Sequence, residues 1–302
     1  MSLISNAVEI IKGEGFSGPH CFVLLTRYAA LTGDRALLKL VGNTLEDMST
    51  MEPTAMLAYA YAEYFQAMGG QAPEFPPAAA DYILSSCDRD DRALALAYVK
   101  CARVFSREDY LEQCLKLLAD EELMAQGGAF SALAFIELYR ATFNESYLDA
   151  AVSMADVIEE HFSSMFSPED AYDLEYPSMN SAVSLLYDEL ARMLQSEKWI
   201  SASGKQKVFI KKLADKYSSK VAFGLISLLD EEFAPQTIVC AVKGESIPKE
   251  LLSIIAFYSP LTEILVCSEG DSGGKNTCRQ QILKYPAYYF LKNGCLEEIK
   301  GL

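Results

Sequence analysis

The sequence predicts a mainly helical protein: an α/α toroid of about six helical hairpins, followed by a small C-terminal α/β unit. Three observations lead to this prediction. Helical hydrophobic periodicity runs from residue 3 to about residue 231. Two kinds of helix alternate along that stretch, and short β-branched segments replace it afterwards. We therefore expect a toroid over residues 1–232 and an α/β unit over residues 233–302.

The first kind of helix is apolar nearly all round, as in Met56–Ala62 and Phe130–Ile136. The second kind is one-sided. Between residues 146 and 162, Leu148 and Val152 lie on an apolar stripe, whereas Asp149 and other acidic residues face away. A helix that is apolar on every side has to be enclosed by others, and a one-sided helix can form an outer wall. The alternation therefore predicts two concentric layers of helices.

Short polar joints separate these helices, at residues 31–34, 105–108, 143–145 and 195–197. Each joint ends one helix and offers a side-chain oxygen that can cap the next, which is what an antiparallel helix pair requires. The joints are unevenly spaced along the chain. An open superhelix of helix pairs is the alternative, but it would keep a stricter period, so the spacing favours the closed toroid.

Strand-type segments follow the helices. Thr237–Val242 and Glu263–Cys267 are short and rich in β-branched or aliphatic residues, and Pro248–Phe257 between them has the pattern of a helix opened by proline. This order predicts a β-α-β unit with a parallel strand pair. Ala287–Leu291 is the expected third strand.

Charge and composition exclude several classes of partner. The chain has 26 basic and 42 acidic residues, so its net charge is 26 − 42 = −16, which argues against nucleic acid and against anionic membrane surfaces. No apolar stretch approaches the roughly 20 residues of a membrane span. The eight cysteines form no C-x-x-C pair. Together with an N-terminus that lacks signal-peptide features, this predicts a cytoplasmic protein.

Four segments resemble one known family. They are Leu133–Leu148, Tyr176–Val183, the glycine-rich Gly13–His20, and the aromatic Tyr285–Cys295. In this order they are similar to the helical and C-terminal parts of the YyaL-type, thioredoxin-domain-containing family. The helical part of that family belongs with the six-hairpin glycosidase-like toroids, which include sugar 2-epimerases. The resemblance implies the toroid fold and a link to carbohydrate chemistry.

The chain departs from that family where the family carries polar motifs. Residues 48–62 lack both of the family's histidine-containing segments, and Gln126–Phe130 replaces a pair of aspartates. The lysine of the glycine-rich segment is His20, and the redox C-x-x-C motif has no counterpart. We therefore expect a catalytically impaired binding or scaffold protein with a carbohydrate-like or peptide ligand. The alternative is a carbohydrate-modifying enzyme, an epimerase or glycoside hydrolase, that uses carboxylates at a cavity rim.

Sugar acid–base chemistry needs titratable groups held across a pocket. The candidates for that role are His20, Glu52, Asp173 and Glu175. Each also has a structural interpretation: His20 as a packing or capping residue, Glu52 as an acid favoured by the dipole at a helix start, and the acidic loop 167–177 as a solvated surface.

Tyr172, Tyr176 and Asn180 are the candidate ligand-binding residues, because tyrosine rings can stack on sugars and the polar groups beside them can bind hydroxyls. The cysteine spacings match no common zinc pattern, so we expect no metal site. The loop Asp271–Lys275 lacks the spacing of a nucleotide-binding motif. We therefore expect no cofactor.

Overall fold

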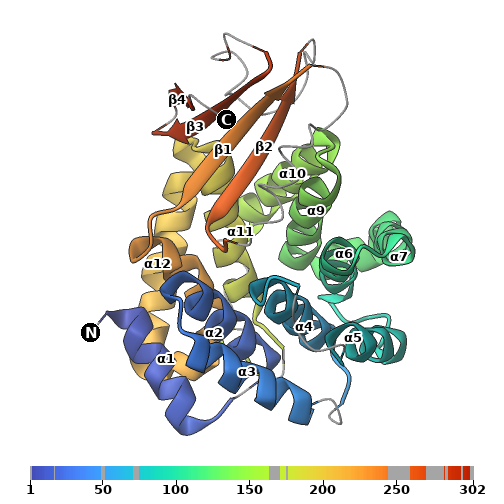
Figure 1. Ribbon diagram of the computed structural model, residues 1–302, viewed down its shortest axis with the longest axis vertical. Helices are drawn as coiled ribbons and strands as arrows, with labels where there is room; N and C mark the ends of the chain where they lie inside the picture. The colour runs from blue at the N-terminus through green and yellow to red at the C-terminus, as the bar shows by residue number, and fades with distance from the viewer. Residues whose placement is uncertain are drawn as a thin grey trace.

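The computed structural model describes residues 2–16, 18–48, 52–70, 75–162, 171–174, 176–243, 259–269, 282, 285–293 and 295–299. Over these residues the protein is mainly helical, with a small sheet built from C-terminal strands (Figure 1). This confirms the predicted class of mainly helical protein with a C-terminal sheet. None of the described helices is long and apolar enough to cross a membrane.

The longer helices are α1 (Leu3–Glu14), α2 (Pro19–Thr32), α3 (Arg35–Met48), α4 (Ala55–Ala67), α5 (Phe75–Ser86), α6 (Leu94–Phe105), α7 (Glu108–Ala119), α9 (Ala129–Thr142), α10 (Glu145–Phe162), α11 (Met179–Leu194) and α12 (Glu197–Tyr217). The shorter helical segments are α8 (Glu121–Gly127), η2 (Ser218–Val221), α13 (Ala222–Leu225) and η3 (Ile226–Glu231).

The predicted polar joints contain the residues that end one helix and cap the next. Helix α2 ends at Gly33, whose φ of 71° is a left-handed conformation that costs glycine little. The next residue, Asp34, accepts a 2.9 Å hydrogen bond from the backbone N–H of Leu37 in the first turn of α3. At a later joint, the Ser196 hydroxyl accepts from the N–H of Trp199 at the start of α12.

Buried and one-sided helices alternate along the chain. Helices α2, α4, α6, α9 and α11 are buried over most of their length, and we call them the buried helices. The helix that follows each of them keeps a polar side: in α7, only Tyr110, Cys114 and Leu118 are buried. Each buried helix contacts the next one along the chain, and α13 contacts both α11 and α2.

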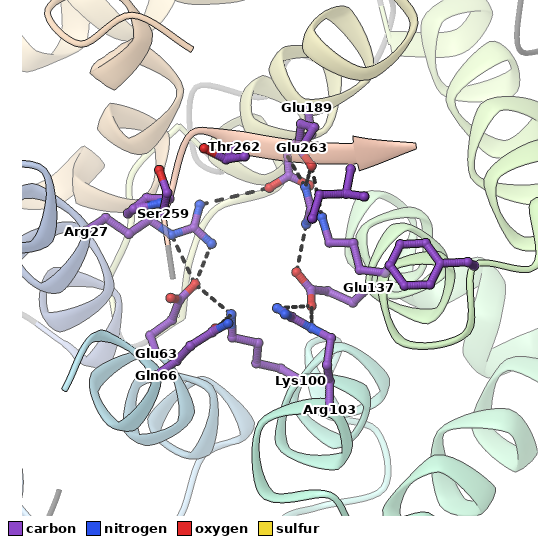
Figure 2. Close-up of a pocket in the computed structure, with 14 residues that line it drawn as sticks. Arg27, Glu63, Gln66, Lys100, Arg103, Glu137, Glu189, Ser259, Thr262 and Glu263 are labelled. Atoms are coloured by element: carbon purple, nitrogen blue, oxygen red, sulfur yellow. Dashed lines mark hydrogen bonds and ion pairs between the residues drawn. The ribbon is translucent and has the colours of Figure 1, made fainter. Parts of the chain in front are cut away.

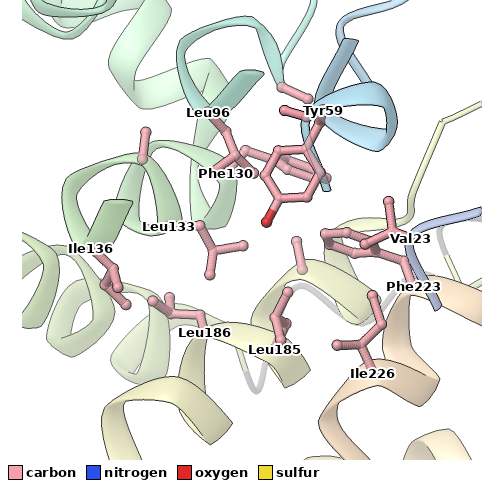
Figure 3. Close-up of a cluster of buried hydrophobic side chains, with 14 of the residues drawn as sticks. Val23, Tyr59, Leu96, Phe130, Leu133, Ile136, Leu185, Leu186, Phe223 and Ile226 are labelled. Atoms are coloured by element: carbon pink, nitrogen blue, oxygen red, sulfur yellow. The ribbon is translucent and has the colours of Figure 1, made fainter. Parts of the chain in front are cut away.

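Apolar side chains fill the space between the buried helices (Figure 3). Val23, Leu96, Leu133, Leu185 and Phe223 come from five different helices, and each is at most 2% exposed. The space bounded by Tyr59, Leu96, Leu133 and Leu185 has no volume large enough for a water molecule. The core of the helical part is therefore closely packed at the level of these residues.

The sheet consists of β1 (Gln236–Val242), β2 (Thr262–Ser268), β3 (Ala287–Lys292) and β4 (Cys295–Glu298), in the order β2-β1-β3-β4. Strands β1 and β2 are parallel, which confirms the predicted pair, and Ile238 lies opposite Ile264. Strand β3 was predicted, and it pairs antiparallel with β1. Strand β4 was not predicted, and the expected helix over residues 248–257 lies outside the described residues.

Polar contacts attach the sheet to the ends of α9 and α11. The N–H of Val266 in β2 donates a 2.9 Å hydrogen bond to the hydroxyl of Tyr139. The hydroxyl of Thr237 in β1 donates to the carbonyl of Arg192 at 2.9 Å. The sheet therefore lies over the C-terminal ends of buried helices, and β2 passes directly across them (Figure 2).

Candidate functional site

His20 lies in the first turn of α2 and is fully buried. It packs against the glycine-rich segment so closely that a Cβ on Gly18 would lie 2.6 Å from its Cε1 and 2.9 Å from the carbonyl oxygen of Leu174. Burial opposes protonation, but the hydrogen bond with Cys21 and the charge of Asp173 outweigh it, so the pKa of His20 is raised. Its surroundings are those of a packed core residue.

Asp173 is also fully buried, and the backbone uses both of its carboxylate oxygens. Oδ1 accepts a 2.8 Å hydrogen bond from the N–H of Ser178, and Oδ2 accepts one of 2.8 Å from the N–H of Phe223. The N–H of Asp173 itself donates to the carbonyl of Lys220. These bonds join the loop to the starts of α11 and α13.

Glu52 does not join this pair. It is exposed ahead of α4, two residues before Thr54, whose hydroxyl caps that helix. Glu175 lies outside the described residues, as do residues 163–170 of the acidic loop. Of the three candidate catalytic residues that the structure describes, it brings together His20 and Asp173.

Two of the three candidate ligand-binding residues share a cleft of about 720 Å³. Tyr172 and Tyr176 line it; Tyr176 is half exposed, and Tyr172 packs edge-on against Tyr217 at a ring separation of 5.5 Å. Asn180 is buried in the first turn of α11. Further lining comes from Asp88, from residues 90–93 and from Phe130, which the sequence had not indicated.

Acidic residues dominate this part of the lining. Asp88 and Asp90 are exposed, and Asp91 accepts hydrogen bonds from the N–H groups of Ala55 and Ala93, which hold this loop against the start of α4. The cleft therefore combines half-exposed aromatic surface with carboxylates and one arginine, Arg92.

A second polar site, absent from the sequence interpretation, lies at the C-terminal ends of the buried helices under β2 (Figure 2). It is a connected set of ion pairs, which we call the charged layer. Among the described residues, its basic members are Arg27, Lys100, Arg103, Arg140, Arg192 and Lys207, and its acidic members are Glu63, Glu137, Asp188, Glu189, Asp230 and Glu263. The six basic and six acidic side chains balance in formal charge.

Glu63 is the centre of one half of the charged layer. Its Oε1 accepts from Nε of Arg27 at 3.0 Å and lies 3.2 Å from Nζ of Lys100. Arg27 also donates to the hydroxyl of Tyr59 at 3.0 Å, and Lys100 donates to Oε1 of Gln66 at 3.0 Å. The side chains of Arg27, Glu63 and Lys100 are at most 6% exposed, and each of these ions has a partner, which buried charges require.

Arg140 is the centre of the other half. It donates to Glu137 at 2.7 Å and to Glu189 at 3.2 Å, and its Nη2 donates to both oxygens of Glu263 at 2.8 Å. Glu263 belongs to β2, so this side chain extends the ion pairs from the helices into the sheet. Arg103 donates to Glu137 from the other side at 3.0 Å.

Burial and charged neighbours shift the pKa values of this layer in different ways. Burial raises the pKa of Asp188 to about 7, although Arg192 and Lys207 act to lower it. Burial opposes the charge on Glu137, but Arg103, Lys100 and Arg140 hold its pKa well below the usual value. Burial lowers the pKa of Lys100 to about 8, with Arg103 and Arg27 acting in the same direction and Glu63 and Glu137 opposing them. The aligned peptide dipoles also place partial negative charge at these helix ends, which favours cations there.

A recurring spacing in the sequence marks the charged layer. Glu63, Lys100 and Glu137 are each 37 residues apart (100 − 63 = 37 and 137 − 100 = 37), and a polar residue follows each of them three positions later. Residues three apart lie on one helix face. A charged residue followed three positions later by another polar residue, near the end of an otherwise apolar helix, is the signal that would have identified the site.

Comparisons with known proteins leave the chain unassigned. No protein-family model matches it, and no curated protein does. Among the described residues, no group of three or more His, Cys, Asp or Glu side chains is arranged to hold a metal ion. The fold and the two sites therefore define a mainly helical protein with a C-terminal sheet, an acidic aromatic cleft and a charged layer between helices and sheet.

Proposed function

We propose that this chain is a diverged six-hairpin α/α toroid, similar to the helical part of the YyaL-type family, and that it is a binding or scaffold protein. The order of helix contacts supports the toroid. Contacts run from α2 through α4, α6, α9 and α11 to α13, and α13 contacts α2 again. A path that returns to its first helix is expected of a closed ring, whereas an open superhelix separates its ends.

The filled interior is the observation that carries the binding or scaffold assignment. An enzyme of this architecture needs a concave pocket in which the substrate meets the catalytic groups. In this chain Tyr59, Leu96, Leu133 and Leu185 meet without room for a water molecule. A sugar has no space between the buried helices at this level.

The hydrogen bonds of Asp173 also disfavour the alternative of an epimerase or glycoside hydrolase. A general acid or base needs an oxygen within hydrogen-bonding reach of the substrate. Both oxygens of Asp173 accept from backbone N–H groups, and Glu52 is exposed at a distance along the chain. Neither Asp173 nor Glu52 is therefore placed to act as the acid or base of this alternative, and Glu175 lies outside the described residues.

The cleft of Tyr172 and Tyr176 is the proposed ligand site. Its volume of about 720 Å³ is in the range of ligand pockets. A peptide segment with a lysine or arginine beside an apolar residue fits best, because Asp88 and Asp90 complement its charge and Tyr176 offers apolar surface. A neutral saccharide would use the rings but gain nothing from the charge.

Isothermal titration with short peptides tests this proposal. We expect peptides that combine Arg with Leu or Pro to bind more tightly than their Glu-substituted counterparts, and binding to weaken as salt screens the charges. Asp90→Asn should weaken binding severalfold. Asp215→Asn, at an exposed position of α12, is the matched control and should not.

The same titration with mono- and disaccharides separates the ligand classes. Saccharide binding that Tyr176→Ala abolishes, without any peptide binding, would replace the peptide by a sugar. Turnover of a glycoside or epimerisation of a free sugar by the purified chain would overturn the non-enzymatic assignment. Binding of neither class would contradict the cleft as a ligand site.

A further inference from the structure

The charged layer lines a small, partly open cavity that the cleft and its ligand do not explain. Its volume is about 90 Å³, the share of about three water molecules in the liquid. Lys100 and Arg103 line it from α6, one turn apart, with Glu63 and Glu137 beside them (Figure 2). A cavity of this size and polarity has room for a ligand of only a few heavy atoms.

Lys100 presents a reactive amine to this cavity. Its side chain is 2% exposed, and its Nζ donates to Gln66 at 3.0 Å and lies 3.2 Å from Glu63. Burial, together with Arg103 and Arg27, lowers its pKa to about 8, so the neutral, nucleophilic amine is more populated near neutral pH than in an exposed lysine with a pKa of about 10.4.

Arg103 offers a binding group next to that amine. Its Nε and Nη2 both contact Oε2 of Glu137, at 3.0 and 2.9 Å. Its Nη1 has no acceptor among the residues that the structure describes, and the side chain is 18% exposed. A guanidinium with N–H groups left over is suited to a carboxylate.

We propose that Lys100 is the amine of a carbonyl-binding site that takes a small oxo acid, with Arg103 holding the carboxylate of the ligand. Neighbouring cations and burial are the two features that activate lysines for imine formation in proteins. The ligand class follows from the size of the cavity, the amine and the unused N–H groups of Arg103. This site is independent of the cleft and of the peptide that we propose there.

The chemistry is a reversible condensation without an oxidant or reductant. The lone pair of Nζ forms a bond to the carbonyl carbon, and the carbonyl oxygen takes up a proton. This oxygen then leaves as water, whose two hydrogens both derive from the amine, and a carbon–nitrogen double bond remains. Protonation of this imine restores the positive charge opposite Glu63, so the ion pair at 3.2 Å is retained.

Borohydride trapping on the intact wild-type chain tests the proposal. Glyoxylate is the probe, and cyanoborohydride reduces its imine to a stable carboxymethyl amine that peptide mapping by mass spectrometry locates. We expect Lys100 to be labelled about tenfold faster than the exposed Lys205, with a rate that rises through the pKa of about 8. Labelling of Lys205 but not of Lys100 would overturn the proposal.

Two further measurements test the role of Arg103. Acetate should protect Lys100 from glyoxylate, because it competes for the same guanidinium, and it should leave Lys205 unprotected. In Arg103→Lys, whose folding is checked by its thermal melt, formaldehyde should still label Lys100 while glyoxylate labelling falls about tenfold. An equal loss for both aldehydes, or no protection by acetate, would overturn the assignment of an oxo acid.

Discussion

The buried helices bring together two layers of opposite character, one turn apart. Val23, Tyr59, Leu96, Leu133 and Leu185 form an apolar layer (Figure 3), and the residue four positions later in each helix is charged (Figure 2). The charged residues, in the same order, are Arg27, Glu63, Lys100, Glu137 and Glu189. Because residues four apart lie on one helix face, the same five faces supply both layers.

The two layers differ in how strongly each side chain depends on a particular neighbour. Burial of an apolar side chain lowers the free energy of the folded protein, and almost any apolar neighbour of the right volume is sufficient. A buried ion recovers its desolvation cost only when a particular opposite charge stands beside it. The apolar layer therefore supplies stability, and we infer that the charged layer selects which end of the helices receives the sheet, through Glu263 and Arg140.

Glu63→Gln is expected to have the largest effect on folding. The substitution keeps the size of the side chain but removes the ion-pair partner of Lys100 and leaves Arg27 with only the more distant Glu189, at 3.9 Å. Loss of one partner from a buried pair costs about 3–5 kcal/mol. Urea denaturation measures the free energy of unfolding. A loss below about 1 kcal/mol would mean that water reaches these ions.

Leu133→Ala is the matching change in the apolar layer. Leu133 is 2% exposed and lies one turn before Glu137, so its truncation leaves a cavity that costs about 2–5 kcal/mol. This loss comes from the missing volume, so Leu133→Met, which restores most of it, should cost less than about 1.5 kcal/mol, whereas Glu63→Gln, which also conserves volume, should cost more. A larger loss in Leu133→Met than in Glu63→Gln would contradict the distinction between the layers.

Acid should weaken the charged layer before the apolar one. The pKa of Glu137 is depressed in the folded protein, so its contribution is fully present above the unfolded pKa of about 4.3–4.5 and is lost as pH falls below it. Each pH unit below that value costs about 1.4 kcal/mol per such group, or about 2 kcal/mol by pH 3. Unfolding measured against pH should show a shallower acid limb in Glu137→Gln than in the wild type.

The sequence predicts the elements well and their ionic partners poorly. Apolar periodicity identified the buried helices and the strands around Ile238 and Ile264, because these patterns depend only on local spacing. Tyr172 and Tyr176, which the composition of their loop suggested as ligand-binding residues, line one cleft. Lys100 and Glu137 went unnoticed, because single charges in apolar helices become informative only when their partners on other helices are known.

The smallest loss in the free energy of unfolding is expected at an exposed ion pair of the sheet. This pair is the reference against which the costs at buried positions are compared. Lys292 and Glu297 lie 2.7 Å apart, as close as Arg140 and Glu137, but both are about 60% exposed. Water already solvates these charges, so Glu297→Gln should cost less than about 1 kcal/mol, and salt should reduce that further. The two ion pairs have the same length, so any larger cost of Glu137→Gln in the same denaturation assay measures burial and the number of partners. Equal costs at the two positions would show that the charged layer is not desolvated, and the contrast between the layers would then fail.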